Sequence, residues 1–122
     1  MRFMLLYKPG FEDTAPPASE NMEAVGRLIG EMVEAGVLLA TDGLLPSSLG
    51  ARIQIENGGF RVTDGPFAEA KELIGGFAIV RVNAKEDAIA WAKRFLAITG
   101  RGESEIRQMH DDPGYDSSLT PC

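Results

Sequence analysis

Cysteine and histidine are almost absent from this chain of 122 residues, which has one of each, Cys122 and His110. A single cysteine can form no disulfide within the chain, which is typical of proteins that fold in a reducing cytoplasm. One thiol and one imidazole also exclude a multi-histidine or thiolate metal site within one chain. The chain has no nucleophilic cysteine, no histidine pair and no phosphate-binding glycine loop, which argues against hydrolase and nucleotide chemistry. We therefore expect no metal and no cofactor.

Long apolar runs and an excess of basic residues are missing as well. No run approaches the roughly 20 apolar residues that cross a bilayer, and the apolar residues 1–8 are too short for a signal sequence with its cleavage site. The net charge of -6, from 18 acidic and 12 basic residues, repels phosphate backbones and anionic membranes. We expect a cytoplasmic protein without a nucleic-acid or membrane partner.

The apolar residues that are present indicate strands that are covered on both faces. In the run from Phe3 to Tyr7, Phe3, Leu5 and Tyr7 face one way and Met4 and Leu6 face the other. Residues 77–82 are also apolar on both faces. Such runs are typical of strands that are buried on both sides.

Two helices are predicted, each with an apolar stripe. The first begins at Ser19 and ends at Gly36, in a left-handed C-cap. Gly26 and Gly30 lie on nearly the same face of this helix, which favours the close approach of another backbone over a functional groove. The second helix follows residues 83–86, which resemble a capping box, and Gly100 closes it.

The remaining segments complete one α+β domain. Residues 37–40 are predicted as a strand, residues 51–56 and 60–63 as a hairpin around Asn57-Gly58, and residues 103–109 as an edge strand. Without the hairpin, the order is the ferredoxin-like βαββαβ, which places both helices on one face of the sheet. We expect a second copy to cover the other face, sheet against sheet, in a homodimer.

A mid-chain segment resembles a known family. Asp64-Gly65-Pro66-Phe67, followed by Ala68-Glu69-Ala70-Lys71-Glu72, resembles the signature of the DGPF-type domain in the YCII-related family. The supporting segments, in the order and spacing of that family from about residue 2 to 110, are Met4-Leu5-Leu6, Ala35-Gly36-Val37-Leu38, Gly43-Leu44 with Pro46, Gly75-Gly76-Phe77, Glu86 to Ala92, and Glu105-Ile106-Arg107.

The resemblance implies a ferredoxin-like domain over residues 1–110 that forms a dimeric α/β barrel, followed by a tail at 111–122. In this family a pocket with an acidic residue has been taken as a sign of enzymatic activity, and similar domains occur attached to sigma factors. Related barrel dimers include monooxygenases, isomerases and dehalogenase-like proteins. The YCII branch proper is noted for a histidine–aspartate pair, but here Leu45 stands where relatives can carry the histidine, so a histidine-dependent mechanism is not expected.

Asp64 is the candidate catalytic residue. Apolar walls raise the pKa of a carboxyl group, so an Asp64 enclosed by Phe67, Phe77 and Tyr7 would act as a general acid or base. The alternative is that its carboxylate braces the Gly-Pro turn through backbone hydrogen bonds.

Five further residues are candidates for substrate binding: Lys71, Asp42, Tyr7, Phe67 and Arg81. Lys71 would hold a substrate carboxylate, or else pair with a neighbouring glutamate. Asp42 precedes a glycine after a strand, so it is either a second carboxylate of the pocket or a turn residue. Arg81 is either an anion handle in the dimer cavity or a surface charge, and Tyr7 is either a ligand contact or part of the core.

Two functions remain open at this stage. The first is a small-molecule-binding dimer that acts as a cofactorless acid/base enzyme on a small carbonyl or anionic compound. The second is a non-catalytic regulatory module that binds a metabolite or a protein. An enclosed pocket beside Asp64 would favour the first, and an Asp64 held by backbone donors with no adjoining void would favour the second.

Overall fold

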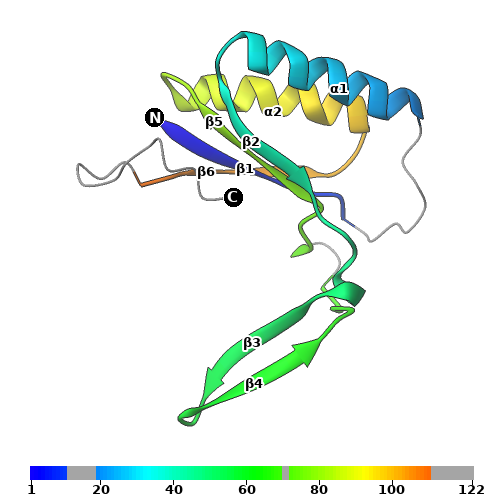
Figure 1. Cartoon of the computed structure of the whole chain (residues 1–122), viewed down its shortest axis with the longest axis vertical. Coiled ribbons are helices and arrows are strands. Elements are labelled where there is room, and N and C mark those ends of the chain that lie inside the picture. Colours follow the sequence, from blue (N-terminus) through cyan, green and yellow to red (C-terminus); the bar gives the residue numbers. More distant parts are fainter. Residues whose placement is uncertain (11–18, 70–71, 111–122) are drawn as a thin grey trace.

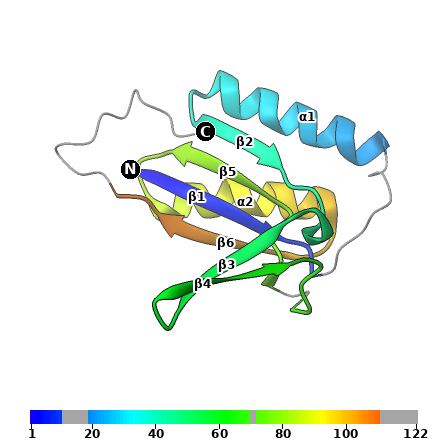
Figure 2. The same ribbon diagram turned by 60° about the horizontal axis from the view of Figure 1, so that its bottom comes forward.

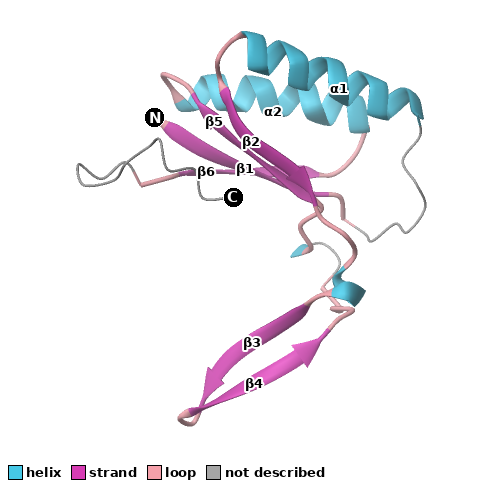
Figure 3. Cartoon of the chain, viewed as in Figure 1, coloured by secondary structure: helices cyan, strands magenta, loops and turns pink. Residues whose placement is uncertain are grey.

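Two helices lie together on one face of a four-stranded antiparallel sheet, and a two-stranded hairpin projects from the other side of that sheet (Figures 1 and 3). The computed structural model describes residues 1–10, 19–69 and 72–110. In chain order the elements are β1 (Arg2–Lys8), α1 (Ser19–Glu34), β2 (Leu38–Gly43), the 3-10 helix η1 (Ser47–Leu49), β3 (Ala51–Glu56), β4 (Gly59–Asp64), β5 (Gly76–Arg81), α2 (Lys85–Thr99) and β6 (Glu103–Gln108).

The strand order in the large sheet is β2-β5-β1-β6, with every neighbouring pair antiparallel. Without β3 and β4, the element order is the predicted βαββαβ. β6 lies at an edge, as predicted from its single strongly apolar residue, Ile106. The prediction of a mixed α+β domain with two helices and antiparallel strands is therefore confirmed.

The core lies between the helices and the sheet. Phe3 and Leu5 of β1 pack with Val80 of β5 and with Leu28 and Met32 of α1, and all five are buried. Residues opposite one another in an antiparallel pair share a face, so the pairs Met4–Ile79 and Leu6–Phe77 lie on the side turned away from the helices. We call this side the distal face. Each buried apolar side chain of this size stabilises the fold by about 1.5–3 kcal/mol.

Glycines end both helices, as predicted. Gly36 has a φ of 72°, and its N–H donates to the carbonyl of Val33 at 3.0 Å. The N–H of Val37 donates to the carbonyl of Met32 at 3.0 Å. These two bonds form a Schellman motif, which needs the left-handed conformation that glycine adopts most easily. Gly100 closes α2 in the same conformation, with a φ of 75°.

Two local predictions are wrong. The capping box at residues 83–86 does not form: the N-cap of α2 is Ala84, and no side chain caps the helix there. The acidic side chains of Glu86 and Asp87 lie in the first turn instead, where they complement the helix dipole. The second strand is also longer than predicted, because pairing with β5 extends β2 to Gly43 rather than ending it at Ala40.

The predicted close approach of a backbone to Gly26 and Gly30 is not found among the described residues. A Cβ atom built on either glycine has no heavy atom within 4 Å. Gly26 borders a cavity instead, which is described below.

The hairpin forms a sheet of its own, as predicted, and turns at Asn57 and Gly58, both of which have positive φ. Each of the six residues in β3 and each of the six in β4 is exposed. Figures 1 and 2 show the hairpin as an arm of its own, outside the large sheet. Two sequence predictions lie outside the described residues: the role of Lys71 and the tail at 111–122.

Candidate functional site

A cavity of about 870 Å³ opens between the two helices and the sheet, at the end where β1 and β2 finish and β5 and β6 begin. Most of its lining is apolar. The lining includes Tyr7, Gly26, Thr41, Asp42, Trp91 and Phe95. Cavities of roughly 300–1,000 Å³ with an apolar lining and few polar groups are typical small-molecule sites.

Tyr7 at the end of β1 brings one hydroxyl group to this cavity. Its ring meets the ring of Phe95 from α2 edge to face, with centroids 5.0 Å apart and planes at 83°. The hydroxyl donates to the backbone carbonyl of Arg101 at 3.2 Å. Both the ring and the hydroxyl are therefore held in place, while the oxygen lone pairs can still accept a hydrogen bond.

Asp42 and Thr41, at the end of β2, bring the other polar groups. The Oδ1 atom of Asp42 accepts the N–H of Gly43 at 2.9 Å, and Asp42 is exposed. Because Asp42 pairs with Phe77, its side chain lies on the distal face of the edge strand β2. The Thr41 hydroxyl donates to the carbonyl of Phe77 at 2.8 Å. Asp42 thus combines the turn role predicted for it with a position on the cavity.

The segment that resembles the family signature lies elsewhere, at the base of the hairpin. The Gly65 N–H donates to the carbonyl of Gly50 at 3.0 Å, and the Phe67 N–H donates to the Ser47 Oγ atom at 3.1 Å. A Cβ atom at Gly65 would overlap the backbone carbonyl of Ser47. The sequence Asp64-Gly65-Pro66-Phe67 therefore fastens the returning strand to η1, and only glycine fits at its second position.

Arg52 and Phe67 stack on this base. The Arg52 guanidinium lies 3.9 Å from the centroid of the Phe67 ring, and its Nη1 atom is 3.1 Å from the Glu69 Oε2 atom. A backbone hydrogen bond within Glu69, and then the hydrogen bond from Arg52, lower the pKa of the Glu69 carboxyl group. The ring of Phe67 thus packs under a cation rather than against the cavity.

The predicted site residues consequently occupy three places. Tyr7 and Asp42 line the cavity. Asp64 and Phe67 lie at the base of the hairpin, and neither is among the residues that line the cavity. Arg81 ends β5 at the opposite end of the sheet, where it borders a shallower hollow with Trp91 and Arg94.

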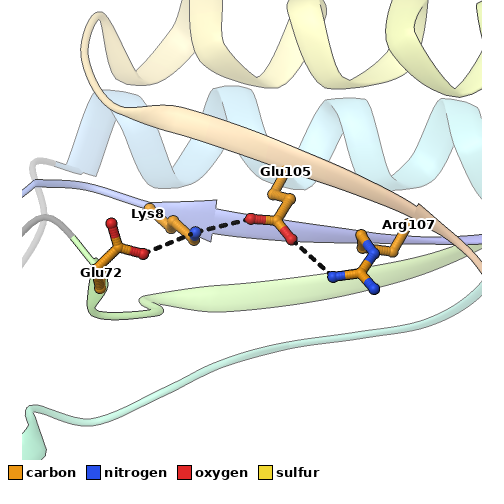
Figure 4. Close-up of polar contacts among 4 residues, drawn as sticks. All are labelled: Lys8, Glu72, Glu105 and Arg107. Atoms are coloured by element: carbon orange, nitrogen blue, oxygen red, sulfur yellow. Dashed lines mark hydrogen bonds and ion pairs between the residues drawn. The ribbon is translucent and has the colours of Figure 1, made fainter.

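A polar cluster on the distal face was not predicted. The Lys8 Nζ atom lies 2.8 Å from the Glu105 Oε1 atom and 3.4 Å from the Glu72 Oε2 atom, and the Arg107 Nη1 atom lies 3.2 Å from the Glu105 Oε2 atom (Figure 4). The hydrogen bond from Lys8, followed by that from Arg107, lowers the pKa of Glu105. The hydrogen bond to Glu105 raises the pKa of Lys8.

Sequence reasoning missed the cavity because its lining comes from both helices and all four strands of the large sheet. The pair of glycines in α1 was the available signal, because a helical glycine that no other backbone approaches leaves space for a cavity. For the polar cluster, the alternation of Lys8 with Leu6 placed the lysine on the distal face. Its partner could be named only after the register had set β6 beside β1.

No group of three or more His, Cys, Asp or Glu side chains in the described ranges is placed to hold a metal ion. Neither helix of the described chain has the length and apolar character of a membrane span.

The model of the YCII-related domain matches residues 1–110. An uncharacterized protein of Rhizobium meliloti (strain 1021) is 33% identical over 90 residues, which are 73% of this chain and 70% of that protein.

Among solved structures, a 5-chloro-2-hydroxyhydroquinone dehydrochlorinase from Burkholderia phenoliruptrix AC1100, in complex with 2,5-dihydroxybenzoquinone, has a TM-score of 0.47 and 11% identity over 95% of this chain and 100% of that one. At this level the likeness supports no argument about substrate or reaction. The family model and the identity to the Rhizobium protein together establish the family: this chain belongs to the YCII-related family.

Proposed function

We propose that this domain binds a small, largely apolar molecule in the cavity between the helices and the sheet. The observation that carries the proposal is the cavity itself, which has about 870 Å³ and a mostly apolar lining with a fixed tyrosine and a carboxylate on it. Apolar walls supply affinity by removing ligand surface from water, and the few polar groups set orientation.

The polar groups restrict the class of ligand. Asp42 is among the residues that line the cavity, and its exposed carboxylate repels an anionic group nearby. The Tyr7 hydroxyl already donates to Arg101, so it offers an acceptor to a ligand hydroxyl, or its proton to a ligand carbonyl after a small rotation. We therefore favour a neutral compound with an aromatic or alicyclic body and a carbonyl or hydroxyl group.

Gly26 and Gly30 provide a matched test of this site. Both are exposed glycines of α1 with no heavy atom near a built Cβ, but only Gly26 lines the cavity. Trp91, the single tryptophan, also lines the cavity and reports on its contents. Acetophenone, a neutral aromatic ketone, is the probe, and saturable quenching of Trp91 fluorescence is the measurement.

We expect saturable quenching in the wild type and in Gly30→Leu, and at least about tenfold weaker binding in Gly26→Leu, which places a side chain in the cavity. Gly30→Leu controls for the gain in helix propensity, because both variants replace a mid-helix glycine by leucine. Quenching that is merely collisional in the wild type, or equal affinity in the two variants, would contradict the proposal.

Proton transfer is a second candidate function, favoured by the position of Asp42 on the cavity. Asp42 belongs to the edge strand β2, so its carboxylate would reach around that edge to take a proton from the carbon next to the ligand carbonyl. The Tyr7 hydroxyl would donate a hydrogen bond to the oxygen that gains negative charge. The same carboxylate then returns a proton to carbon, so no cofactor or co-reactant is consumed. This is the acid/base reaction expected from the sequence, with Asp42 in the role first given to Asp64.

Deuterium exchange separates the two carboxylates. We expect the wild type to accelerate exchange of the acetophenone methyl protons in D2O, followed by NMR, and Asp42→Asn to lose about 10²-fold or more of that acceleration. Asp64→Asn is the matched variant, since it neutralises an exposed aspartate outside the cavity lining. Binding without exchange in the wild type would support the non-catalytic module instead, and loss in Asp64→Asn alone would place the chemistry at the hairpin.

A further inference from the structure

Two hydroxyl groups share one backbone carbonyl in the wall of the cavity. The carbonyl of Arg101 accepts the Tyr7 hydroxyl at 3.2 Å and the Thr99 hydroxyl at 3.0 Å. Tyr7 comes from β1, Thr99 is the last residue of α2, and all three residues line the cavity. A carbonyl oxygen has two lone pairs, so it can accept both hydroxyl protons at once.

Thr99 has a second acceptor within reach. Its hydroxyl oxygen also lies 3.2 Å from the carbonyl of Leu96. A hydroxyl group has a single proton to donate, so Thr99 divides it between two carbonyls. The Leu96 carbonyl loses little when the proton turns away from it, because the N–H of Gly100 donates to it at 2.8 Å. Thr99 can therefore give its proton fully to Arg101.

The ring of Tyr7 is held in place, whereas its hydroxyl proton can turn. The ring meets Phe95 edge to face, and Phe95 and Thr99 are four residues apart, on one face of α2. Gly102 also lies against the ring, because a Cβ atom built on this glycine would be 2.8 Å from the Tyr7 Cε1 atom. Rotation about the bond from the ring to the hydroxyl oxygen moves the proton alone.

We propose that Tyr7 selects a carbonyl group on the ligand and that Thr99 releases the Tyr7 proton for it. Without ligand, the Tyr7 hydroxyl donates to Arg101. When a ligand carbonyl reaches the Tyr7 oxygen, the tyrosine proton turns to it, and Thr99 keeps a hydroxyl donor on the Arg101 carbonyl. The inference rests on the proposed binding in the cavity, and it narrows the ligand from a carbonyl or hydroxyl compound to a hydrogen-bond acceptor.

Thr99 matters because a ligand in the cavity displaces water. A carbonyl that gives up a hydrogen bond where water cannot replace it lowers the affinity for the ligand. With Thr99 present, each acceptor keeps a donor: the ligand carbonyl has Tyr7, and the Arg101 carbonyl has Thr99. A ligand hydroxyl that donates to the Tyr7 oxygen needs no such exchange, so Thr99 favours ketones specifically. Thr99 is thus a positioning residue that acts through Tyr7.

Two probes of nearly the same shape measure this selection. Acetophenone has a C=O group where α-methylstyrene has a C=CH2 group, so only the ketone accepts a hydrogen bond. NMR titration of the Trp91 indole N–H signal gives both dissociation constants, since Trp91 is the single tryptophan and lines the cavity. The ratio of the two constants, alkene to ketone, is compared between variants, which cancels the difference between the probes in transfer from water.

Thr99→Val and Thr99→Ser are the matched variants. Valine keeps the shape of threonine without its hydroxyl, and serine keeps the hydroxyl without the methyl group. We expect the ratio to fall about fivefold in Tyr7→Phe, which removes one neutral hydrogen bond, and at least about threefold in Thr99→Val. Thr99→Ser should keep the wild-type ratio. In the Tyr7→Phe background, Thr99→Val should lower the ratio no further, because the hydroxyl that it supports is gone.

The possible failures differ from one another. A wild type that binds neither probe saturably would refute the proposed function and this inference with it. Binding of both probes, with one ratio in the wild type and Tyr7→Phe, would overturn only the selection of a carbonyl. A ratio that falls in Tyr7→Phe but not in Thr99→Val, or that falls equally in Thr99→Ser and Thr99→Val, would overturn the role of the Thr99 hydroxyl.

Discussion

Gly65 shows that the sequence Asp64-Gly65-Pro66-Phe67 has a structural role whatever its chemistry. The backbone of Gly65 passes so close to the Ser47 carbonyl that any Cβ atom would overlap it, and its N–H bonds to Gly50. A glycine in such a place is explained by close approach, without a catalytic argument.

We therefore predict that Gly65→Ala destabilises the fold by about 1–3 kcal/mol or forces the hairpin base to shift. Gly50→Ala is the control, because its Cβ would lie 3.6 Å from the same Ser47 oxygen, an ordinary contact. Urea unfolding, with the amide exchange of residues 47–67, measures the difference. Equal stability of the two variants would contradict the packing argument.

Glu105 makes the stability of the fold depend on pH. Its pKa is lowered in the folded state by hydrogen bonds from Lys8 and Arg107. A carboxyl group with a lowered folded-state pKa contributes stability that is present above its unfolded value of about 4.3 and is lost as the pH falls through the folded-state value.

We predict that Glu105→Gln is less stable than the wild type near pH 6, and that the difference shrinks as the pH falls below the unfolded-state value of about 4.3. Urea midpoints measured from pH 6 to pH 3 give the comparison. Glu103→Gln is the control, since the neighbouring Glu103 has no part in the Lys8 cluster drawn in Figure 4. A constant difference between wild type and Glu105→Gln across this range would contradict the role given to the ion pairs.

For single residues, the sequence predicted which side chains are candidates for a site more readily than it predicted which residues surround them. Tyr7 and Asp42 were candidates, and both lie on the cavity. Asp64 was placed beside Phe67, Phe77 and Tyr7 because the chain order allowed it. The excursion of the hairpin carries Asp64 away from the cavity lining, and no local pattern encodes that separation.

At the level of elements, the helices are specified by their apolar stripes and by the glycines that end them. Gly36 needs its left-handed conformation, whereas Gly30 lies inside α1 with free space around a built Cβ. The two glycines therefore have opposite expected effects when a methyl group is added.

We predict that Gly36→Ala destabilises the fold by about 1–2 kcal/mol, the cost of a left-handed L-residue. Gly30→Ala should stabilise it by up to about 1 kcal/mol, because alanine is the better helix former. Thermal unfolding followed by circular dichroism gives both signs in one experiment. A stabilising effect of Gly36→Ala would contradict the Schellman motif at the end of α1.

The sequence predicted which residues of a strand share a face, but it did not predict which strands pair with one another. The alternation within β1 assigns Phe3 and Leu5 to the core and Met4 and Leu6 to the distal face, and the structure agrees. The end of β2 was placed too early, because Thr41-Asp42-Gly43 has the composition of a turn and yet pairs with β5. Pairing partners come from tertiary structure, which overrides local propensity.

For the whole molecule, the sheet with its two helices and the hairpin are physically separable. The core residues belong to β1, α1, β5, α2 and the residue after β5, and β3 and β4 contribute none of them. The chain enters and leaves the hairpin at adjacent points, because the Gly65 N–H bonds to the Gly50 carbonyl at 3.0 Å. A short link can therefore replace the hairpin without pulling on the sheet.

We predict that a chain in which a Gly-Ser link replaces residues 51–64 folds cooperatively, with the thermal midpoint of the intact chain to within a few degrees. The physical reason is that exposed side chains bury little surface in a single copy, so their removal costs the fold little. Circular dichroism measures folding, and acetophenone quenching of Trp91 should be unchanged. A chain that unfolds on excision would show that the arm supports the core.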